Sequence, residues 1–242
     1  MGRVFACSDL HGMLDLYKQI KNFLKPEDKV YFLGDAGDRG TDCWETIKAI
    51  LNDPQFISLI GNHEDMLLSV MQDVIKYERL DYNNLDLLYQ NGGMNTYEGW
   101  SNETPEEQRK WFYKIKKLPA EEKYINKDGK IIFLSHAGFT PNPDNLDWHG
   151  WYVDLIWDRC HITNAWPHDA PDNWIIIHGH TPIEYVVDEL QWKDRTIERP
   201  VMPKAFWYAD RHKCCIDCGS FYTKSTVLLD LDTFEEHYFT TN

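Results

Sequence analysis

Apolar residues along this chain gather in short continuous runs instead of alternating with polar ones. Five such runs are each followed closely by a polar side chain, and they span Arg3–Cys7, Lys29–Leu33, Phe56–Ile60, Lys130–Leu134 and Trp174–Ile177. Runs of this length are typical of strands that are buried on both faces, as in parallel sheets. Two further strands are predicted near the end of the sequence, over Cys214–Cys218 and Thr226–Leu231.

A different period, with apolar residues three and four positions apart, fills the spaces between the early runs. It predicts helices over Leu14–Leu24, Trp44–Leu51, Glu64–Leu80 and Pro105–Lys117. Thr41 or Asp42 can cap the second of these helices. Thr104 precedes the last helix, and Glu107 three residues later completes the pattern of a capping box.

The other segments lack both patterns and are expected to be irregular. They are a glycine-rich loop over Gln90–Thr96, a long loop over Pro141–Asn173 with one short helix near Val153–Trp157, and Glu184–Lys213 with a short hairpin. Long segments without regular structure are usually functional. Strands and helices alternate through the early part of the chain, which predicts an α/β fold. A length of 242 residues suits one domain over residues 1–242.

The polar side chains that follow the five runs are of the kinds that bind metal ions. They are Asp9 and His11, Asp35, Asn62 and His63, His136, and His178 and His180. Ligands of open α/β sheets collect just beyond the carboxyl ends of the strands. Asp9 and His11 would also share one side of an extended chain, since strand side chains alternate. Core packing alone does not explain five strands that deliver polar residues at the same end.

We therefore predict a centre of two divalent ions at these strand ends. Two such ions need a bridging carboxylate, and Asp35, directly after Gly34, offers one oxygen to each ion. Imidazole and carboxamide side chains would complete the ligand set. Two ions ~3.5–4 Å apart would hold a hydroxide and orient a phosphoryl group. Asp38 and Arg39 follow closely enough in sequence to serve that phosphoryl group.

The composition narrows the choice of partners and compartment. A formal charge of −14 opposes general binding to nucleic acids, although bound dications would still admit one phosphorylated substrate. No apolar run approaches the ~20 residues of a membrane span. The first residues lack the apolar core of a signal peptide. The six cysteines are therefore expected to be reduced thiols in the cytoplasm.

Three cysteines lie close together near the end of the chain, at Cys214, Cys215 and Cys218. On a strand, Cys214 and Cys218 would face one side of the sheet and Cys215 the other. This arrangement favours packing over the tetrahedral coordination of zinc.

Five sequence blocks carry a family resemblance. They are Ser8-Asp9-Leu10-His11-Gly12, Gly34-Asp35-Ala36-Gly37-Asp38-Arg39-Gly40, Gly61-Asn62-His63-Glu64, Ser135-His136-Ala137-Gly138 and His178-Gly179-His180-Thr181. In this order they resemble the phosphoprotein phosphatase family of the calcineurin-like metallophosphoesterases. The most similar members are small bacterial and phage proteins, which include serine/threonine phosphatases and symmetrical diadenosine tetraphosphatases. The resemblance implies an α/β fold with a central double β-sheet sandwich flanked by helices, and a dinuclear metal site at the strand ends.

The same resemblance assigns roles to individual residues. It places one ion on Asp9, His11 and Asp35, and the other on Asp35, Asn62, His136 and His180. His63 would be the general acid, with Asp38 fixing its tautomer. Arg39 would clamp two phosphoryl oxygens through its planar fork, and Arg159 is the candidate for a second clamp. Manganese is the expected metal, and iron or zinc would suit the same ligands.

Three functions follow from these assignments. The first is a serine/threonine protein phosphatase that hydrolyses phosphate esters by attack of a metal-bridging hydroxide, acting on a phosphorylated protein or a small phosphoester. The alternative is a hydrolase of nucleotides or of dinucleoside polyphosphates of the diadenosine tetraphosphate type. The third, a scaffold without catalysis, is disfavoured because none of the metal ligands of the family blocks is missing from this sequence.

Two residues have alternative roles. Arg159 could pair with Asp154 or Asp158 instead of binding phosphate, and His178 is expected to be structural.

Overall fold

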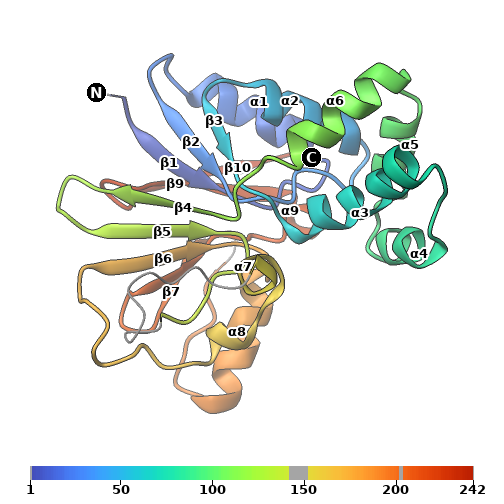
Figure 1. The fold of residues 1–242 in the computed structure, drawn as a ribbon. Helices are drawn as coiled ribbons and strands as arrows, with labels where there is room; N and C mark the ends of the chain where they lie inside the picture. Colours follow the sequence, from blue (N-terminus) through green and yellow to red (C-terminus); the bar gives the residue numbers. More distant parts are fainter. Residues whose placement is uncertain (1, 142–151, 202–203, 242) are drawn as a thin grey trace.

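Two five-stranded β-sheets form the centre of the computed structural model, which describes residues 2–141, 152–201 and 204–241 (Figure 1). The first sheet has the order β10-β9-β1-β2-β3, with β1 Val4–Cys7, β2 Lys29–Phe32, β3 Phe56–Ser58, β9 Ser225–Asp230 and β10 Glu236–Thr240. The second has the order β4-β5-β6-β8-β7, with β4 Glu121–Ile125, β5 Ile131–Ser135, β6 Trp174–His178, β7 Phe206–Tyr208 and β8 Lys213–Cys215. This arrangement confirms the predicted α/β fold with a double sheet.

Both sheets are mixed, and each has three parallel strands. In the first sheet β1 pairs with β2 and β2 with β3 in parallel, and in the second β5 pairs with β6 and β6 with β8 in parallel. The five apolar runs correspond to five of these six strands. The remaining strands pair antiparallel to their neighbours. The polar residues that follow the parallel strands therefore emerge together at one edge of the sandwich.

One hydrophobic core lies between the two sheets. Ala6 and Leu229 of the first sheet share one cluster of buried side chains with Leu134 and Ile177 of the second. All four are fully buried. Because these strands are covered on both faces, their apolar residues follow one another directly rather than at alternate positions.

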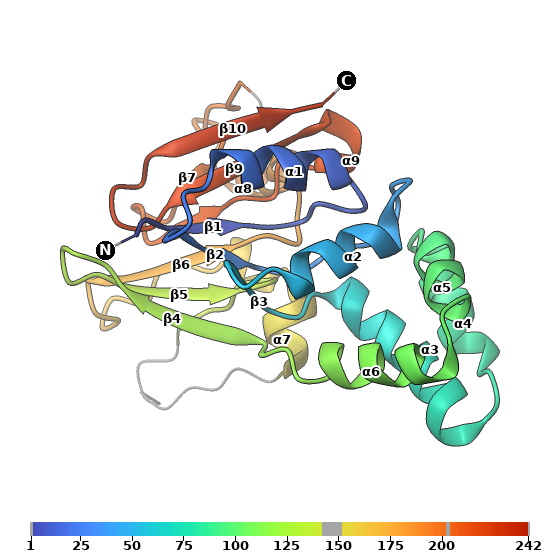
Figure 2. The ribbon, with the colours of Figure 1, turned by 90° about the horizontal axis from the view of Figure 1, so that it is seen from above.

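Helices cover the outer faces of the sandwich (Figures 1 and 2). They are α1 Leu14–Phe23, α2 Cys43–Asn52, α3 Asn62–Tyr77, α4 Tyr82–Gln90, α5 Met94–Ser101, α6 Pro105–Ile115, α7 Tyr152–Trp157, α8 Ile183–Lys193 and α9 Ser220–Thr223, with a 3-10 helix at Cys160–Ile162. Helices α1, α2 and α3 pack on the first sheet, where Phe5 and Phe32 share a cluster with Ile20, Ile47 and Met66. Helix α7 packs on the second sheet, and α4 and α5 project to one side in Figure 2.

Several elements differ from the predictions. The glycine-rich loop predicted over Gln90–Thr96 is present but shorter, since α4 ends at Gln90 and α5 begins at Met94, and Glu184–Lys213 begins inside α8 rather than with irregular chain. Strands β4 and β10 were not predicted, whereas β7 lies within Glu184–Lys213, where a short hairpin was expected, and pairs antiparallel with β8. The edge strands β4 and β10 are only partly buried and carry charged residues, so neither shows an apolar run. Strand β8 ends at Cys215, short of the predicted Cys218.

Asp28 ties the beginning of β1 to the turn before β2. Its carboxylate is 1% exposed and accepts hydrogen bonds from Arg3 N (2.9 Å), Arg3 Nη2 (2.6 Å) and Lys25 N (2.9 Å). Burial raises the pKa of Asp28, but the hydrogen bonds from Arg3 and Lys25 outweigh burial and lower it below 3.8. Asp28→Asn is expected to reduce the free energy of unfolding by about 2 kcal/mol at neutral pH.

This prediction also has a pH dependence. A carboxyl group whose pKa is lower in the folded state stabilises the protein above its unfolded pKa, and the contribution is lost as the pH falls through the folded pKa. Urea unfolding of the wild type and of Asp28→Asn should therefore differ near neutrality and converge below pH 3.8. A difference that stays constant over this range would contradict the assignment.

Candidate metal centre

Asp35 lies at the centre of a cluster of metal-binding side chains. It follows β2 after Leu33 and Gly34, and its carboxylate is 2% exposed. Asp35 Oδ1 lies 3.4 Å from His136 Nε2, and Asp35 Oδ2 lies 3.7 Å from His11 Nε2. Two candidate ligand groups share this carboxylate, one with His11 and His63 and the other with Asp9 and His136. Asp35 therefore stands where a carboxylate could bridge two ions.

The structure brings together all six side chains predicted as metal ligands. They are Asp9, His11, Asp35, Asn62, His136 and His180, and none is more than 6% exposed. Asn62 Oδ1 lies 2.9 Å from both His136 Nε2 and His180 Nδ1. The His180 backbone N–H donates to Asp9 Oδ2 at 3.1 Å. The six come from segments that follow β1, β2, β3, β5 and β6, which belong to both sheets.

Backbone carbonyls determine which nitrogen of two histidines faces the cluster. His11 Nδ1 lies 3.1 Å from Gly37 O, and His136 Nδ1 lies 2.8 Å from Leu33 O. A carbonyl oxygen can only accept, so each Nδ1 carries the proton and donates. When these rings are neutral, as binding of a metal ion requires, the Nε2 lone pairs point toward Asp35. Outer hydrogen bonds of this kind are typical of histidines that bind metal ions.

The cluster contains more acceptors than donors. Burial lowers the pKa of His136, but Asp35 and Asp9 outweigh burial and raise it to about 9. At neutral pH the His136 ring therefore carries a second proton, on Nε2, next to these acceptor groups. Burial and Asp217 raise the pKa of Asp9 well above its ordinary range. His180 Nε2 is buried without a hydrogen-bond partner in the described residues. An excess of buried carboxylate, carboxamide and imidazole ligands fits divalent manganese, iron or zinc.

Left-handed backbone conformations position the cluster. Positive φ angles occur at Asp9 (53°), His11 (44°), Asp35 (61°), Asp38 (65°), Arg39 (65°) and His180 (65°). Strained conformations outside glycine cost free energy and collect at functional sites. They also correct one prediction: Asp9 and His11 do not share one side of an extended chain, because β1 ends at Cys7. A turn, not strand alternation, carries both side chains toward Asp35.

Two glycines let the backbone approach the carboxylates closely. A Cβ atom at Gly61 would lie 2.2 Å from Asp35 Oδ1, and one at Gly179 would lie 2.1 Å from Asp9 Oδ2. Real Cβ atoms do not come this close to other atoms. Any side chain at either position would therefore displace a candidate ligand.

Glu64 supports the cluster and was given no role by the sequence. It is 3% exposed and accepts three backbone hydrogen bonds, from Asp35 N (2.8 Å), Ala36 N (2.9 Å) and Gly61 N (3.0 Å). One carboxylate thus joins the loop after β2 to the beginning of α3. Its place in the block Gly61-Asn62-His63-Glu64 was the available signal.

Replacing this carboxylate should destabilise the fold. In Glu64→Gln an amide N–H₂ would face backbone N–H groups, so at least one donor would be left buried without an acceptor. We expect the free energy of unfolding to fall by about 3 kcal/mol. Urea unfolding measures this loss, with Glu106→Gln on the exposed side of α6 as the matched control. Equal stability of the two variants would contradict the role of Glu64.

His63 and Asp38 form a hydrogen-bonded pair beside Asp35. His63 Nδ1 donates to Asp38 Oδ2 at 2.6 Å, and His63 Nε2 lies 3.7 Å from Asp35 Oδ2. The Thr96 hydroxyl donates to Asp38 Oδ1, and the Asp38 backbone N–H donates to Thr96 Oγ1 at 2.9 Å. Burial lowers the pKa of His63, but Asp35 and Asp38 outweigh burial and raise it. Thr96, in a segment predicted as a loop, was not foreseen as part of this pair.

Arg39 reaches across two of these imidazoles. Its Nη1 donates to His11 Nε2 at 2.7 Å, and its Nη2 donates to His63 Nε2 at 2.9 Å. Arginine donates only, so both histidine nitrogens accept here. The guanidinium therefore lies beside the metal ligands and the predicted general acid at once.

Arg39 and Arg159 line one cavity of about 600 Å³ together with His180. Its wall includes Tyr185 and Tyr222, which are 62% and 71% exposed. Among the described residues, Arg159 pairs with neither Asp154 nor Asp158, the alternative considered from the sequence, and its guanidinium remains available to this cavity.

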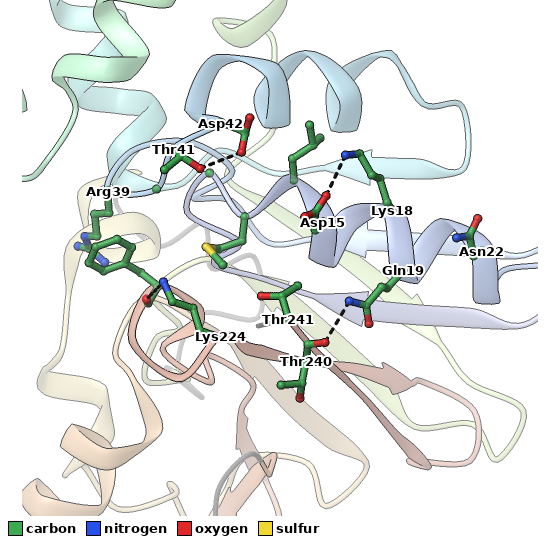
Figure 3. A pocket seen from close by; sticks show the side chains of 15 residues that line it. Asp15, Lys18, Gln19, Asn22, Arg39, Thr41, Asp42, Lys224, Thr240 and Thr241 are labelled. Carbon is green, nitrogen blue, oxygen red and sulfur yellow. Dashed lines mark hydrogen bonds and ion pairs between the residues drawn. The ribbon is translucent and has the colours of Figure 1, made fainter.

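Arg39 also lines a second cavity, of about 680 Å³, between α1 and the end of β10. Figure 3 shows Arg39 at one end of it, with Lys18 paired to Asp15 and Gln19 hydrogen-bonded to the backbone of Thr240. This cavity has a polar lining with charges of both signs. The two cavities therefore meet at one arginine.

The other candidates have structural contacts. His178 is fully buried, and its Nε2 lies 2.8 Å from the Tyr208 hydroxyl. Cys214, Cys215 and Cys218 are buried free thiols and form no candidate metal group within the described residues.

A double sheet with clustered metal ligands at its strand ends defines the class of metal-dependent phosphoesterases. A family model of calcineurin-like phosphoesterases matches residues 2–209. The chain therefore belongs to the calcineurin-like phosphoesterase family and is a metal-dependent hydrolase of phosphoric esters. This confirms the class and the family that the sequence blocks predicted.

Known relatives agree with this assignment. Serine/threonine-protein phosphatase 2 of Salmonella typhimurium is 28% identical over 194 residues, which cover 75% of this chain and 81% of that protein. A candidate diadenosine tetraphosphatase has a TM-score of 0.57 at 12% identity and covers 100% of this chain and 95% of its own. A protein serine/threonine phosphatase of Saccharomyces cerevisiae has a TM-score of 0.55 at 15% identity, covering 100% and 80%. At these identities, the two solved structures show the shared fold alone.

One general property can be stated for the part of the chain that the structure describes. None of its helices combines the length and the apolar content that crossing a membrane requires.

Proposed function

We propose that this protein is a serine/threonine protein phosphatase that uses two divalent ions. The observation that carries the proposal is the convergence of five other buried ligand side chains on Asp35, with the hydrogen-bonded pair of His63 and Asp38 directly beside it. The relative from Salmonella typhimurium supports the choice of substrate. We expect manganese to be the metal that stimulates activity best.

The protein's own residues would divide the reaction between them. One ion would be held by Asp9, His11 and Asp35, and the other by Asp35, Asn62, His136 and His180. Bound ions would supply positive charge to the phosphoryl oxygens and lower the pKa of water. Once Arg39 turns from His63 Nε2 to the phosphoryl group, that nitrogen would carry a proton and donate it to the leaving oxygen, while Asp38 holds Nδ1–H and stabilises the charged ring.

The two arginines would bind the phosphoryl oxygens. Arg39 donates to the Nε2 lone pair of His11, the same lone pair that a metal ion would use. Occupation of His11 by a metal would therefore release the Arg39 guanidinium toward the phosphoryl group. Arg159 lines the same cavity and would provide the second clamp. The planar fork of arginine suits two oxygens of one phosphoryl group.

The two cavities that meet at Arg39 favour an extended substrate. Cavities of about 600 Å³ and about 680 Å³ leave room for chain on both sides of a phosphoryl group. A polypeptide that carries phosphoserine or phosphothreonine would use both. The mixed charge of the second cavity, with Lys18, Lys224, Asp15 and Asp42, suits a polar peptide better than a uniformly anionic ligand.

One observation favours a second function, hydrolysis of a dinucleoside polyphosphate. Tyr185 and Tyr222 line the cavity of Arg39 and Arg159 and are largely exposed, so they could stack on a nucleobase. Because the phosphate chemistry would be shared, the two functions differ only in what lies beyond the phosphoryl group.

A single panel separates them. Turnover with added manganese is compared for a phosphoseryl peptide, a phosphothreonyl peptide, a mononucleotide and diadenosine tetraphosphate. Preference for the peptides supports the phosphatase, and preference for diadenosine tetraphosphate supports the second function. If no phosphoester in the panel is turned over while the protein binds metal, both proposals are wrong.

A further inference from the structure

A buried lysine lies behind the cavity that contains Arg159. Lys213, the first residue of β8, is 0% exposed. Its Nζ donates to His161 O at 2.5 Å and to Asn164 O at 3.1 Å. No carboxylate of the described residues pairs with this ammonium group, whose hydrogen bonds go to backbone oxygens, and burial lowers its pKa to about 8.

The absence of an acidic partner distinguishes Lys213 from an ordinary buried ion pair. A buried ammonium group must have its hydrogen-bonding capacity satisfied, and here backbone carbonyls satisfy it. By donating to the carbonyl groups of His161 and Asn164, Lys213 holds this part of the backbone in place. Carbonyl groups at the end of a helical turn have no partner within the turn and need one from outside.

The two carbonyls belong to the turn that presents Arg159. The 3-10 helix Cys160–Ile162 begins directly after Arg159, and Asn164 follows it closely. Asp158 holds the N-terminal side of the turn (its front), since its carboxylate accepts from Cys160 N at 3.0 Å and from His161 N at 3.2 Å. Lys213 holds the other side of the same turn through its carbonyl groups.

The turn also forms part of the cavity wall. Arg159, Cys160, Ile162 and Thr163 line the cavity that Arg39 and His180 reach from the other elements. Beneath this wall the His161 ring is fully buried and packs edge-on against the His178 ring, with centroids 4.7 Å apart. Contacts from inside the protein therefore help to hold the turn in place.

We propose that Lys213 is the positioning residue for Arg159. It fixes the turn from which the Arg159 guanidinium faces the phosphoryl group, and it does not itself touch substrate. The inference rests on the proposed function in one respect, namely that Arg159 binds the phosphoryl group. Beyond that function, the inference says that a residue of β8 supports phosphate binding indirectly, through the position of Arg159.

The test replaces Lys213 by methionine, which keeps the apolar stem and removes the donors. For Lys213→Met with manganese bound, we expect KM for a phosphoester to rise roughly tenfold and kcat to stay within about twofold of wild type. The Kd of inorganic phosphate, measured by calorimetry, should rise by a similar factor. Lys193→Met is the matched control, since Lys193 donates to the neighbouring Thr163 O at 2.9 Å from the exposed side of the turn.

A double-mutant cycle tests whether Lys213 acts through Arg159. Arg159→Ala should raise KM and the phosphate Kd, and adding Lys213→Met should raise neither further. Additive effects in the double variant, or a wild-type phosphate Kd in Lys213→Met, would overturn the inference. A phosphate Kd left unchanged by Arg159→Ala would overturn it as well.

A second variant covers the case in which Lys213→Met does not fold. Asp158→Asn weakens the front of the same turn without leaving a gap in the core, and it should raise the phosphate Kd in the same direction. If the proposed function is wrong, the wild-type protein itself will turn over no phosphoester, which is a different result from a change in the phosphate Kd of a variant. The phosphate Kd values still decide the role of Lys213 in that event.

Discussion

Replacing His63 by asparagine is expected to reduce kcat for a phosphoseryl peptide by roughly 10²–10⁴-fold. Asparagine cannot donate a proton to the leaving oxygen, and the hydrogen bond from Nδ1 to Asp38 would be lost or weakened. His63 is not among the six proposed metal ligands, so the metal content should remain near that of the wild type. Steady-state kinetics together with elemental analysis measures both quantities on one preparation.

The dependence on the leaving group sharpens this prediction. An aryl phosphate has a better leaving oxygen than phosphoserine and needs less protonation, so His63→Asn should lose less activity toward it. His168→Asn, at a histidine whose side chain is 96% exposed, is the control. Wild-type turnover of the phosphoseryl peptide by His63→Asn would disprove the general-acid role.

Replacing Asp35 by asparagine should abolish the metal centre itself. Asp35 belongs to both candidate ligand groups, and one neutral oxygen cannot replace two charged ones. We expect the bound manganese to fall from about two ions per chain to below about one, and kcat/KM to fall by roughly 10³-fold or more.

A second measurement on this variant does not depend on activity. A ligand that binds only the folded state raises the melting temperature, so added manganese should stabilise the wild type and have little effect on Asp35→Asn. Asp86→Asn, at an exposed residue of α4, should respond as the wild type does. An Asp35→Asn protein that retains two ions and full stabilisation would disprove the bridging role.

Prediction from the sequence was most accurate for the buried parallel strands. The apolar runs before Asp9, Asp35 and His136 correspond to β1, β2 and β5, because a strand covered on both faces has apolar residues at successive positions. Strands β4 and β10 lie at sheet edges and carry polar residues, so their sequences show no such run. Helix α4 fully buries only Leu88, which left too weak a periodicity to predict it.

In the candidate site, too, the sequence predicted features that depend on neighbouring residues and missed contacts between residues far apart in the chain. The residue types and their positions after apolar runs were enough to predict that Asp35 and Asn62 would lie near His136. The supporting contacts were not predictable in this way. Thr96 reaches Asp38 from α5, and Lys213 reaches the turn after Arg159 from β8, and neither lies within a recognisable block.

The sequence by itself determined the fold class, the family and the residue types available for chemistry. These depend on patterns that adjacent residues carry, namely continuous apolar runs and short blocks of polar residues at their ends. Only the tertiary structure decided how the two sheets face each other, and hence which lone pairs meet at Asp35 and which carbonyls Lys213 holds. The physical reason is that hydrogen bonds between distant segments depend on the packing of whole elements, which no local pattern encodes.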